Sequence, residues 1–404
     1  RAGDLESAPG IYRAANAPYD LVVHDFNQDG RPDIACTNGS SSSVSILTNT
    51  TPPGSLAPMF SQPTNYLVGA SPRGVAVGDI NNDGLVDILT ASFTATGGVS
   101  VLPGMPGGTF GPRTDYPLGG TVNGLITGDF DGVNGLDVAC PVFSQNAVRV
   151  LLNDGSGTLV PQGPIALGAG TGPWDVAALD IDGDLDLDLA VVQRTVGRII
   201  LLINDGNGVF TPGAETPVGA TPSSIIAADL DADQDVDLAV TSISGASVSL
   251  LLNQGGVLSR TDLPVGVAAY AVAAADVNND QVLDLVVACG ATGTFFGQPA
   301  FGRFVVLEGS GGGSFTLLQE GAGYGPLNAV EVADLDGDTD PDLAMVSFNA
   351  SLGSALVHEN RGDGRFDSGI GGATGEYFIS VVSPDRSAGA IDPVTQLHVE
   401  FDQA

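Results

Sequence analysis

The sequence contains no lysine: its 13 basic residues are all arginines, against 47 acidic residues and a formal net charge of −34. A surface this acidic repels nucleic acids and anionic membranes, so we expect neither as a partner. No apolar run approaches the roughly 18 residues that a transmembrane helix needs, and no basic segment followed by an apolar one opens the chain. We therefore expect no membrane insertion, and we expect any signal peptide to have been removed.

Glutamate is also scarce, because 39 of the acidic residues are aspartates and only 8 are glutamates. General acidity would not favour the shorter side chain so strongly, which indicates a specific use for short carboxylates. Strong helix formers are few, whereas glycine (57 residues), valine, threonine and serine are plentiful. This composition predicts an all-β chain with many tight turns.

Cysteine is limited to three residues, which allow one disulfide at most. Cys36 and Cys140 occupy equivalent strands, 11 residues beyond the first Asp of an Asp-rich loop in two non-adjacent copies of a repeat. Equivalent positions of that kind are too far apart to bridge. We expect three small buried thiols, which leave the redox compartment undecided.

The Asp-rich loop recurs seven times, and each copy has the same surroundings. The copies occupy residues 25–33, 79–87, 129–137, 180–188, 229–237, 276–284 and 334–342, with first Asp residues 54, 50, 51, 49, 47 and 58 apart. A short alternating strand precedes each loop, a second apolar strand follows it, and a third strand and a Gly-rich turn lead to a fourth. Four short antiparallel strands in about 50 residues are typical of a propeller blade. We predict an all-β, seven-bladed propeller over residues 1–375, in preference to a β-solenoid, whose rungs are usually much shorter.

Stretches such as VAVGDINNDGLVDILTAS (75–92) and VSLLLNQGG (248–256) resemble the FG-GAP/VCBS repeats of bacterial secreted and surface proteins, relatives of the integrin α-subunit propeller. The resemblance covers most of the chain. It implies a seven-bladed propeller with calcium held between the first two strands of a blade, and an extracellular or cell-surface location. It implies much less about what is bound.

The loops themselves have the composition of calcium sites. Calcium takes six to eight hard oxygen ligands, and acidic or amide side chains stand at positions 1, 3, 5 and 9 of these loops, with a backbone carbonyl available at position 7. Polar hairpin turns rich in Asp and Asn are the alternative, but seven copies that hold 27 of the 39 aspartates favour metal over turns alone. Magnesium is disfavoured because its strict small octahedron resists an all-protein cage. The candidate ligands are Asp25, Asn27, Asp29, Arg31 and Asp33; Asp79, Asn81, Asp83, Leu85 and Asp87; Asp129, Asp131 and Asp137; Asp180, Asp182, Asp184, Asp186 and Asp188; Asp229, Asp231, Asp233, Asp235 and Asp237; Asp276, Asn278, Asp280, Val282 and Asp284; and Asp334, Asp336, Asp338, Asp340 and Asp342.

The seven loops, numbered 1 to 7 along the chain, are not equal. Loops 1, 2 and 6 carry Asn at position 3 and should bind more weakly, whereas loops 4, 5 and 7 carry Asp at all five odd positions. Loop 3 has Val133 in place of the third acid, so it either uses Asn134 or stays empty. We therefore expect about six or seven structural Ca²⁺ ions. Gly occupies position 6 only in loops 1 and 2, so the sequence does not predict the backbone conformation at this position in the other loops.

A ligand site is expected on the face opposite the calcium loops, where strand 1 of each blade begins and strand 2 ends. The residue six positions before the first Asp of each loop differs from copy to copy, and so does the residue fourteen positions after it. Core positions of a repeat, in contrast, tend to be uniform. Their mixture of aromatics, Arg and Asn suits a glycan or a peptide segment. An insertion at 290–303 adds two further aromatics to this face; alternatively, aromatics plug the channel and the insertion covers the rim. The candidates are Tyr19, Arg73, Asn123, Trp174, Tyr270, Asn328, Phe93, Phe143, Arg194, Phe295, Phe296 and Phe348.

Two features are discounted as functional motifs. The RGD at 361–363 lies in the register of the turns at 153–155 and 204–206, so we interpret it as a turn between strands 3 and 4. His24, His358 and His398 are scattered and have no paired nucleophile, and we expect His24 to be structural.

Beyond residue 376 the repeat stops. Residues 376–404 resemble the opening strands of a bacterial immunoglobulin-like domain, or they form a C-terminal extension of the propeller. The first interpretation predicts that the chain is part of a longer, multi-domain surface protein.

Three functions remain open. The first is a calcium-stabilised extracellular binding or adhesion module that recognises a glycan or an extracellular protein. The second is a polysaccharide lyase or hydrolase, since propellers host such chemistry, but no acid pair stands clear of the metal loops and no catalytic residue is predicted. The third is a structural spacer of a surface protein.

Overall fold

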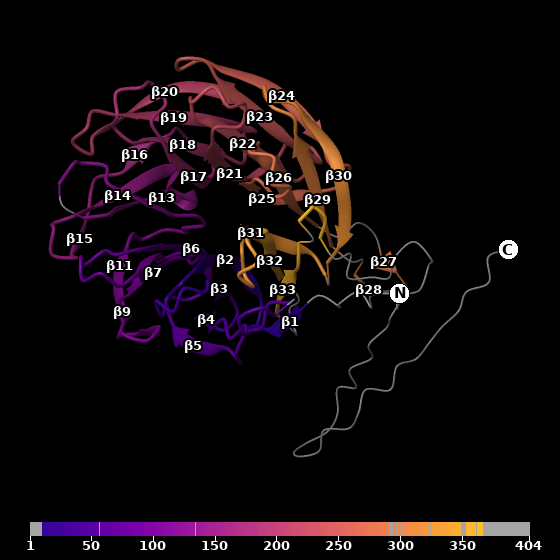
Figure 1. Cartoon of the computed structure of the whole chain (residues 1–404). Helices are drawn as coiled ribbons and strands as arrows, with labels where there is room; N and C mark the ends of the chain where they lie inside the picture. The colour runs from indigo at the N-terminus through magenta and orange to yellow at the C-terminus, as the bar shows by residue number, and fades with distance from the viewer. Residues whose placement is uncertain are drawn as a thin grey trace, which may run out of the picture.

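The computed structural model describes residues 10–366 except for 56, 134, 291–293, 296–297, 300–301, 324, 349–352 and 361. Seven antiparallel sheets stand around a central axis as the blades of a propeller, which confirms the predicted fold class (Figure 1). The described residues contain no α-helix, only the 3-10 turn η1 (Phe143–Gln145). The described residues therefore include no helix that is long and apolar enough to cross a membrane. The segment 376–404 lies outside the described residues.

The blades are numbered by their loops, and their strands run from the axis outward. Blade 1 contains β2 (Pro18–His24), β3 (Asp33–Asn38), β4 (Ser43–Leu47) and β5 (Thr64–Leu67). Blade 2 contains β6 (Pro72–Gly78), β7 (Asp87–Ser92), β8 (Gly98–Leu102) and β11 (Thr114–Pro117). Blade 3 contains β12 (Ile126–Gly128), β13 (Asp137–Val142), β14 (Ala147–Asn153), β15 (Leu159–Pro161) and β16 (Ile165–Ala166). Blades 4 to 6 contain β17 (Pro173–Leu179), β18 (Asp188–Gln193), β19 (Arg198–Asn204) and β20 (Phe210–Pro217); β21 (Pro222–Ala228), β22 (Asp237–Ser242), β23 (Ser247–Asn253) and β24 (Leu258–Pro264); and β25 (Ala269–Ala275), β26 (Asp284–Cys289), β29 (Arg303–Gly309) and β30 (Phe315–Ala322). Two small hairpins stand apart, β9 (Gly104–Met105) with β10 (Thr109–Phe110) and β27 (Thr294–Phe295) with β28 (Gln298–Pro299).

Blade 7 closes the ring with strands from both ends of the chain. It contains β31 (Leu327–Ala333), β32 (Asp342–Ser347) and β33 (Ser354–His358), and its outer strand is β1 (Gly10–Arg13). The register pairs Gly10 with Val357 and Arg13 with Ser354. A closed ring leaves no inter-blade face exposed to water, and this shared blade joins the two ends of the chain.

The hydrophobic core lies between blades rather than within them. Each apolar cluster combines two neighbouring sheets, as Ile80 and Leu89 of blade 2 do with Val138 and Leu151 of blade 3. The second strand of every blade is buried along its whole length because it has a neighbouring blade on each face. This explains why the middle of those strands is mainly apolar on both faces rather than alternating.

The three cysteines are free and buried in these second strands, as expected from their register. Burial raises the pKa of each of the thiols, Cys36, Cys140 and Cys289, to about 12, so they stay protonated and unreactive.

The last Asp of each loop, at position 9, accepts hydrogen bonds from backbone amides on both sides of its hairpin. In loop 3, Asp137 accepts the amide of Phe130 at 2.8 Å on one oxygen and the amide of Asn153 at 2.7 Å on the other. Every loop repeats the pair of bonds, so this carboxylate joins strand 2 to the loop before it and to the end of strand 3. Its uniform presence therefore has a structural cause besides any metal.

An asparagine at the end of the third strand ties one blade to the preceding one. The Asn153 amide donates to the Ile80 carbonyl at 2.7 Å and to the Leu136 carbonyl at 3.2 Å. Equivalent cross-blade bonds come from Asn49, Asn204, Asn253 and Asn360. Blades 2 and 6 have a glycine at this place and lack the tie.

Candidate functional site

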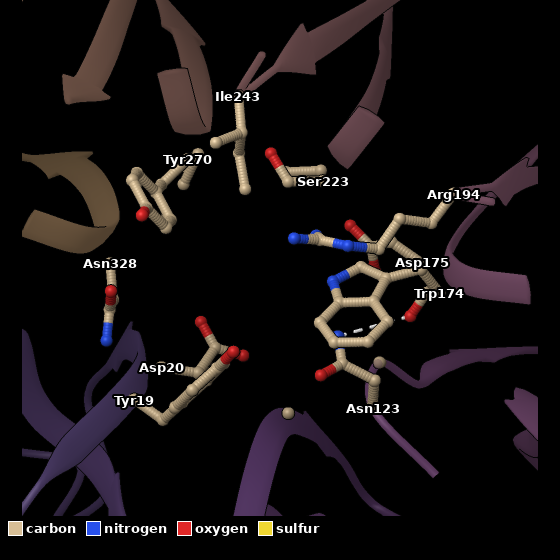
Figure 2. A pocket seen from close by; sticks show the side chains of 14 residues that line it. Tyr19, Asp20, Asn123, Trp174, Asp175, Arg194, Ser223, Ile243, Tyr270 and Asn328 are labelled. Carbon is tan, nitrogen blue, oxygen red and sulfur yellow. Dashed lines mark hydrogen bonds between the residues drawn. The ribbon is translucent and has the colours of Figure 1, made fainter. Parts of the chain in front are cut away.

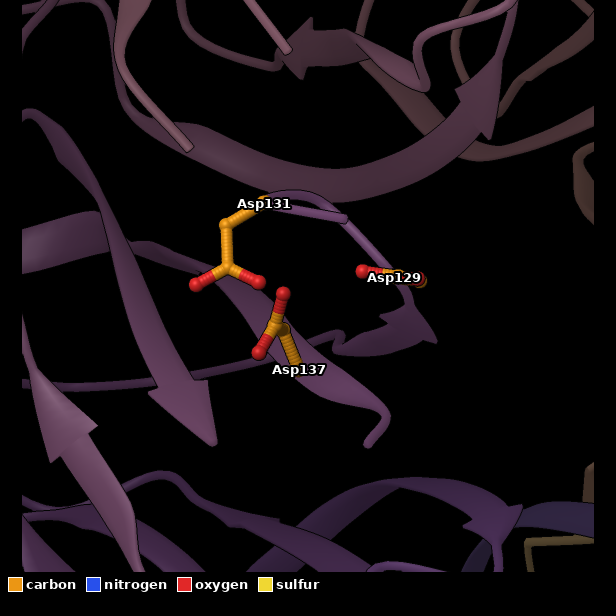
Figure 3. Close-up of side chains that lie close together, drawn as sticks. All are labelled: Asp129, Asp131 and Asp137. Carbon is orange, nitrogen blue, oxygen red and sulfur yellow. The ribbon is translucent and has the colours of Figure 1, made fainter. Parts of the chain in front are cut away.

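The loops bring their aspartates together at three of the five predicted positions. In four loops the carboxylates at positions 1, 3 and 9 each offer an oxygen within 4.8 Å of the others, as Figure 3 shows for loop 3. The four triads are Asp129, Asp131 and Asp137; Asp180, Asp182 and Asp188; Asp229, Asp231 and Asp237; and Asp334, Asp336 and Asp342. Loop 3 therefore forms a triad although Val133, 53% exposed, stands where its third acid was expected. Asn134 lies outside the described residues.

Local hydrogen bonds shape each loop around its first Asp. In loop 4 the Asp180 carboxylate accepts the amides of Gly183 at 2.7 Å and Leu185 at 2.9 Å. Position 6 has a left-handed backbone whether it is Gly, as Gly30 with φ 85°, or not, as Leu185 with φ 76°. The loop fold is thus the same with and without glycine, although a non-glycine residue is strained there by about 1–3 kcal/mol.

The remaining acids of the loops face elsewhere. The Asp184 carboxylate, at position 5, accepts the amide of Asp186 at 3.0 Å, and neither residue belongs to the triad of its loop. In loop 5 the side chain at position 7, Asp235, accepts the Gly255 amide of the turn between strands 3 and 4 at 3.2 Å. The ligand roles predicted for position 5 and for the backbone carbonyl at position 7 remain predictions.

Loops 1, 2 and 6 keep the same geometry with Asn at position 3. The Asn27 side-chain oxygen accepts the Asp29 amide at 2.9 Å, as Asp182 accepts the Asp184 amide at 3.3 Å. In loop 1 the Arg31 guanidinium also pairs with the Asp29 carboxylate. That pair gives loop 1 part of the positive charge a cation would supply.

Loop 7 shows that the donor set fits a hard cation. Asp336 is 8% exposed, and one of its carboxylate oxygens is buried without a hydrogen-bond partner. Burial first, and then repulsion from Asp338 and Asp334, raises its pKa to about 6. Burial likewise raises the pKa of Asp342 to about 8. A divalent cation would satisfy the unpaired oxygen and restore the charged form of both carboxylates.

On the axis lies a cavity of about 100 Å³ at the predicted mouth of the ring (Figure 2). It gathers six of the seven residues found 6 before each first Asp, together with Arg194 and Ile243 from the set 14 after it. Its side chains come from all blades except blade 2. The cavity is lined by Tyr19, Asp20, Gly74, Asn123, Gly124, Trp174, Asp175, Arg194, Ser223, Ser224, Ile243, Tyr270, Ala271 and Asn328.

Arg73, Phe93 and Phe143 form the wall beside this cavity. The Arg73 guanidinium carbon lies 3.5 Å from the centre of the Phe93 ring and 5.4 Å from that of Trp174. Phe93 and Phe143 each lie edge-on to Trp174, with ring centres 5.7 Å apart. Part of the predicted ring therefore packs down and holds Trp174 in place, while Trp174 itself remains partly exposed to the cavity.

The other predicted aromatics do not join the cavity. Phe348 is 40% exposed and is absent from its lining. The side chain of Phe295 and the whole of Phe296 lie outside what the structure describes.

Three acidic residues on the axis were missed by the sequence reasoning. Asp20 accepts the amide of Val75 at 3.0 Å, and Asp175 accepts that of Ile225 at 3.1 Å, so each carboxylate joins its blade to the next. Both keep some contact with the cavity, yet burial raises the pKa of Asp20 to about 7 and that of Asp175 to about 6. The signal was an Asp directly after Tyr19 and Trp174, where other copies have Gly, Ala or Ser.

The third acid, Glu331, lies in a second chamber of about 220 Å³ along the axis. The other lining residues are apolar: Ile226, Ala227, Ala228, Val272, Ala273, Ala274 and Val332. Burial raises the pKa of Glu331 to about 8, and the nearby Asp20 adds to the effect.

The RGD at 361–363 and the histidines, which were discounted as functional motifs, lie in a turn or pack against aromatic rings where the structure describes them. Gly362 and Gly364 have φ of 75° and 73° in a turn closed by the bridge between Asn360 and Phe366, which agrees with the turn interpretation of 361–363; Arg361 is not described. His358 is fully buried against Phe304, with ring centres 5.1 Å apart. His24 packs on Phe26 at 5.5 Å, and His398 lies outside the described residues.

A family model for the FG-GAP-like repeat matches residues 25–90, 129–191, 180–240 and 229–287, together more than half of the chain. No curated protein sequence matches this chain. The solved structures compared with it below are 12–19% identical to this chain, so they show the propeller fold alone.

Three solved structures illustrate how different the proteins with this fold are. BBS1N in complex with ARL6DN has 12% identity and a TM-score of 0.58, over 85% of this chain and 93% of that one. Virginiamycin B lyase from Staphylococcus aureus has 14% identity and a TM-score of 0.54, over 86% and 98%. An Agrocybe aegerita lectin that recognises non-reducing terminal N-acetylglucosamine has 19% identity and a TM-score of 0.50, over 76% and 80%.

Proposed function

Because the chain belongs to the FG-GAP-like repeat family, we propose that it is a calcium-stabilised extracellular binding module that recognises a glycan through its axial mouth. The calcium part is supported by the four Asp triads and by the unpaired buried oxygen of Asp336. The ions would stabilise the loops and take no part in ligand binding, since the triads and the mouth lie at opposite ends of the strands. Extracellular calcium, at millimolar levels, saturates even sites with Kd of about 10⁻⁴ M.

The observation that supports a glycan is the partly exposed indole of Trp174 beside polar side chains that face the same cavity. Sugar rings stack on aromatic faces, and amide and guanidinium groups bond their hydroxyls. Arg194 supplies such a group beside Trp174, and Ser223 and Asn328 supply others around the cavity, with Asn328 on the side opposite Trp174 (Figure 2). The sugar-binding lectin with the same fold makes this use of a propeller plausible.

A glycan array with and without calcium tests the proposal. Since Trp174 is the single tryptophan of the chain, its fluorescence should change when a bound sugar covers it. Trp174→Ala should weaken calorimetric binding at least tenfold, a loss of about 1.4 kcal/mol. Phe348→Ala, an exposed aromatic outside the cavity, is the matched control and should bind normally. Binding of a protein but no glycan would contradict the glycan assignment.

We propose further that the module is not an enzyme. The acids of the mouth, Asp20 and Asp175, each accept a backbone amide of the neighbouring blade, which holds them in structural hydrogen bonds. Incubation of each bound glycan should therefore yield no cleavage product. Turnover would favour the lyase or hydrolase alternative, and neither binding nor turnover would favour a spacer.

A further inference from the structure

Most described arginines of this acidic protein have a carboxylate partner within 4.0 Å, but the two at the axial mouth do not. The paired ones are Arg31, Arg113, Arg198, Arg260, Arg303 and Arg365. Among the described residues, Arg13, Arg73, Arg149 and Arg194 have no ion pair, and of these only Arg73 and Arg194 lie at the axial mouth. In a chain with 47 acidic and 13 basic residues, two unpaired cations at one site call for an explanation.

Both guanidiniums are held in place by aromatic rings. The Arg194 guanidinium carbon lies 4.2 Å from the centre of the Trp174 ring, and Figure 2 shows this side chain projecting into the cavity beside the indole. The Arg73 guanidinium is 3.5 Å from the Phe93 ring and donates to the Asn123 side chain at 3.1 Å. Stacking orients both groups without neutralising them.

The two positive charges also lie close enough to affect each other. Burial lowers the pKa of Arg194, the nearby Tyr19 and Tyr270 oppose this shift, and repulsion from Arg73 adds a smaller lowering. Burial likewise lowers the pKa of Arg73. A cation that is partly removed from water beside another cation is stabilised by an anion that bridges them.

The acids of the same cavity do not fill this need. Asp20 and Asp175 accept backbone amides of neighbouring blades and form no ion pair with either arginine. A ligand carboxylate would supply this counterion.

We infer that the glycan of the axial mouth carries a carboxylate, as uronic acids do, and that Arg194, which lines the cavity, receives this carboxylate while Trp174 stacks on the sugar ring. Arg73, in the wall beside the cavity, adds a second positive charge. The inference rests on the proposed function and narrows its ligand class. A cavity of about 100 Å³ admits one terminal sugar group rather than a polymer chain, so the rest of the saccharide would lie over the rim.

Paired probes on the wild-type, calcium-loaded protein test the inference. Oligomers of galacturonate, alginate and hyaluronan are each compared with their carboxyl-reduced counterparts. We expect at least one acidic oligomer to bind, with its reduced form about tenfold or more weaker, the loss typical of one charge-assisted hydrogen bond. Affinity for the acidic oligomer should fall with added salt.

Two outcomes separate the inference from the function on which it rests. Equal binding of acidic and reduced probes, or binding of neutral sugars alone, would overturn the carboxylate assignment and leave the glycan-binding proposal intact. If no saccharide binds, both fail.

Variants then locate the contact. Arg194→Gln should weaken binding of the acidic probe about tenfold or more beyond any loss that it causes for the reduced form, and Arg73→Gln should act in the same direction. Arg260→Gln makes the same charge change on the outer strand β24 and should behave as wild type. Arg194→Lys, which keeps the charge, should retain the salt dependence. Equal losses for Arg194→Gln and Arg260→Gln would overturn the assignment.

Discussion

Removing the cross-blade tie at Asn153 is the sharpest test of how the ring is held together. Asn153 is 3% exposed, and its amide nitrogen donates to the carbonyl of Ile80 in blade 2 and to that of Leu136 in its own blade. Asn153→Ala leaves the buried Ile80 oxygen and the half-buried Leu136 oxygen without this donor. An unsatisfied buried acceptor costs about 1–3 kcal/mol, so we expect the free energy of unfolding to fall by about 2–4 kcal/mol.

Two other asparagines calibrate the result. The equivalent bond from Asn253 to the Ile181 carbonyl is longer, at 3.4 Å, so Asn253→Ala should cost less. Asn207→Ala removes an exposed bond within its own turn and should change stability by no more than about 0.5 kcal/mol. Urea unfolding of the calcium-saturated proteins measures all three. A loss for Asn153→Ala no larger than that for Asn207→Ala would refute the tie.

Two further predictions concern the acids. Chelation with excess EDTA should lower the melting temperature markedly, because each ion bound at 100 times its Kd stabilises the fold by about 2.7 kcal/mol; an unchanged melting curve would refute structural calcium. Glu331→Gln should raise the melting temperature above pH about 8 in saturating calcium. With a folded pKa of about 8 against an ordinary 4.5, Glu331 takes up a proton on folding, so its contribution to stability is full below the lower value and is lost as pH rises to the upper one. The difference between variant and wild type should vanish at acidic pH, and a difference independent of pH would contradict this account.

The blade repeat and the loop geometry could be predicted because both are local. Within nine residues, the Asp at position 1 binds the amides of its own loop, so the same pattern forms the same turn at Gly30 and at Leu185. Period alone also located the mouth, since equivalent residues of successive blades meet at the axis. Position 9 was predicted as a metal ligand, but its bonds to the end of strand 3 were not, because they join segments 16 residues apart.

The sequence by itself therefore determined the seven blades, the Asp-rich loops and the set of residues around the axis, all of which depend on contacts within one repeat or on its period. The structure decided that the aspartates at positions 1, 3 and 9 form the triads. Only the tertiary structure decided how the ring closes, since β1 and β33 are separated by almost the whole described chain. It also decided which mouth residues face the cavity and which, like Phe93, pack beneath them. Last, it turned Asp20, Asp175 and Glu331 into buried acids, because burial on the axis exists only once all seven blades stand together.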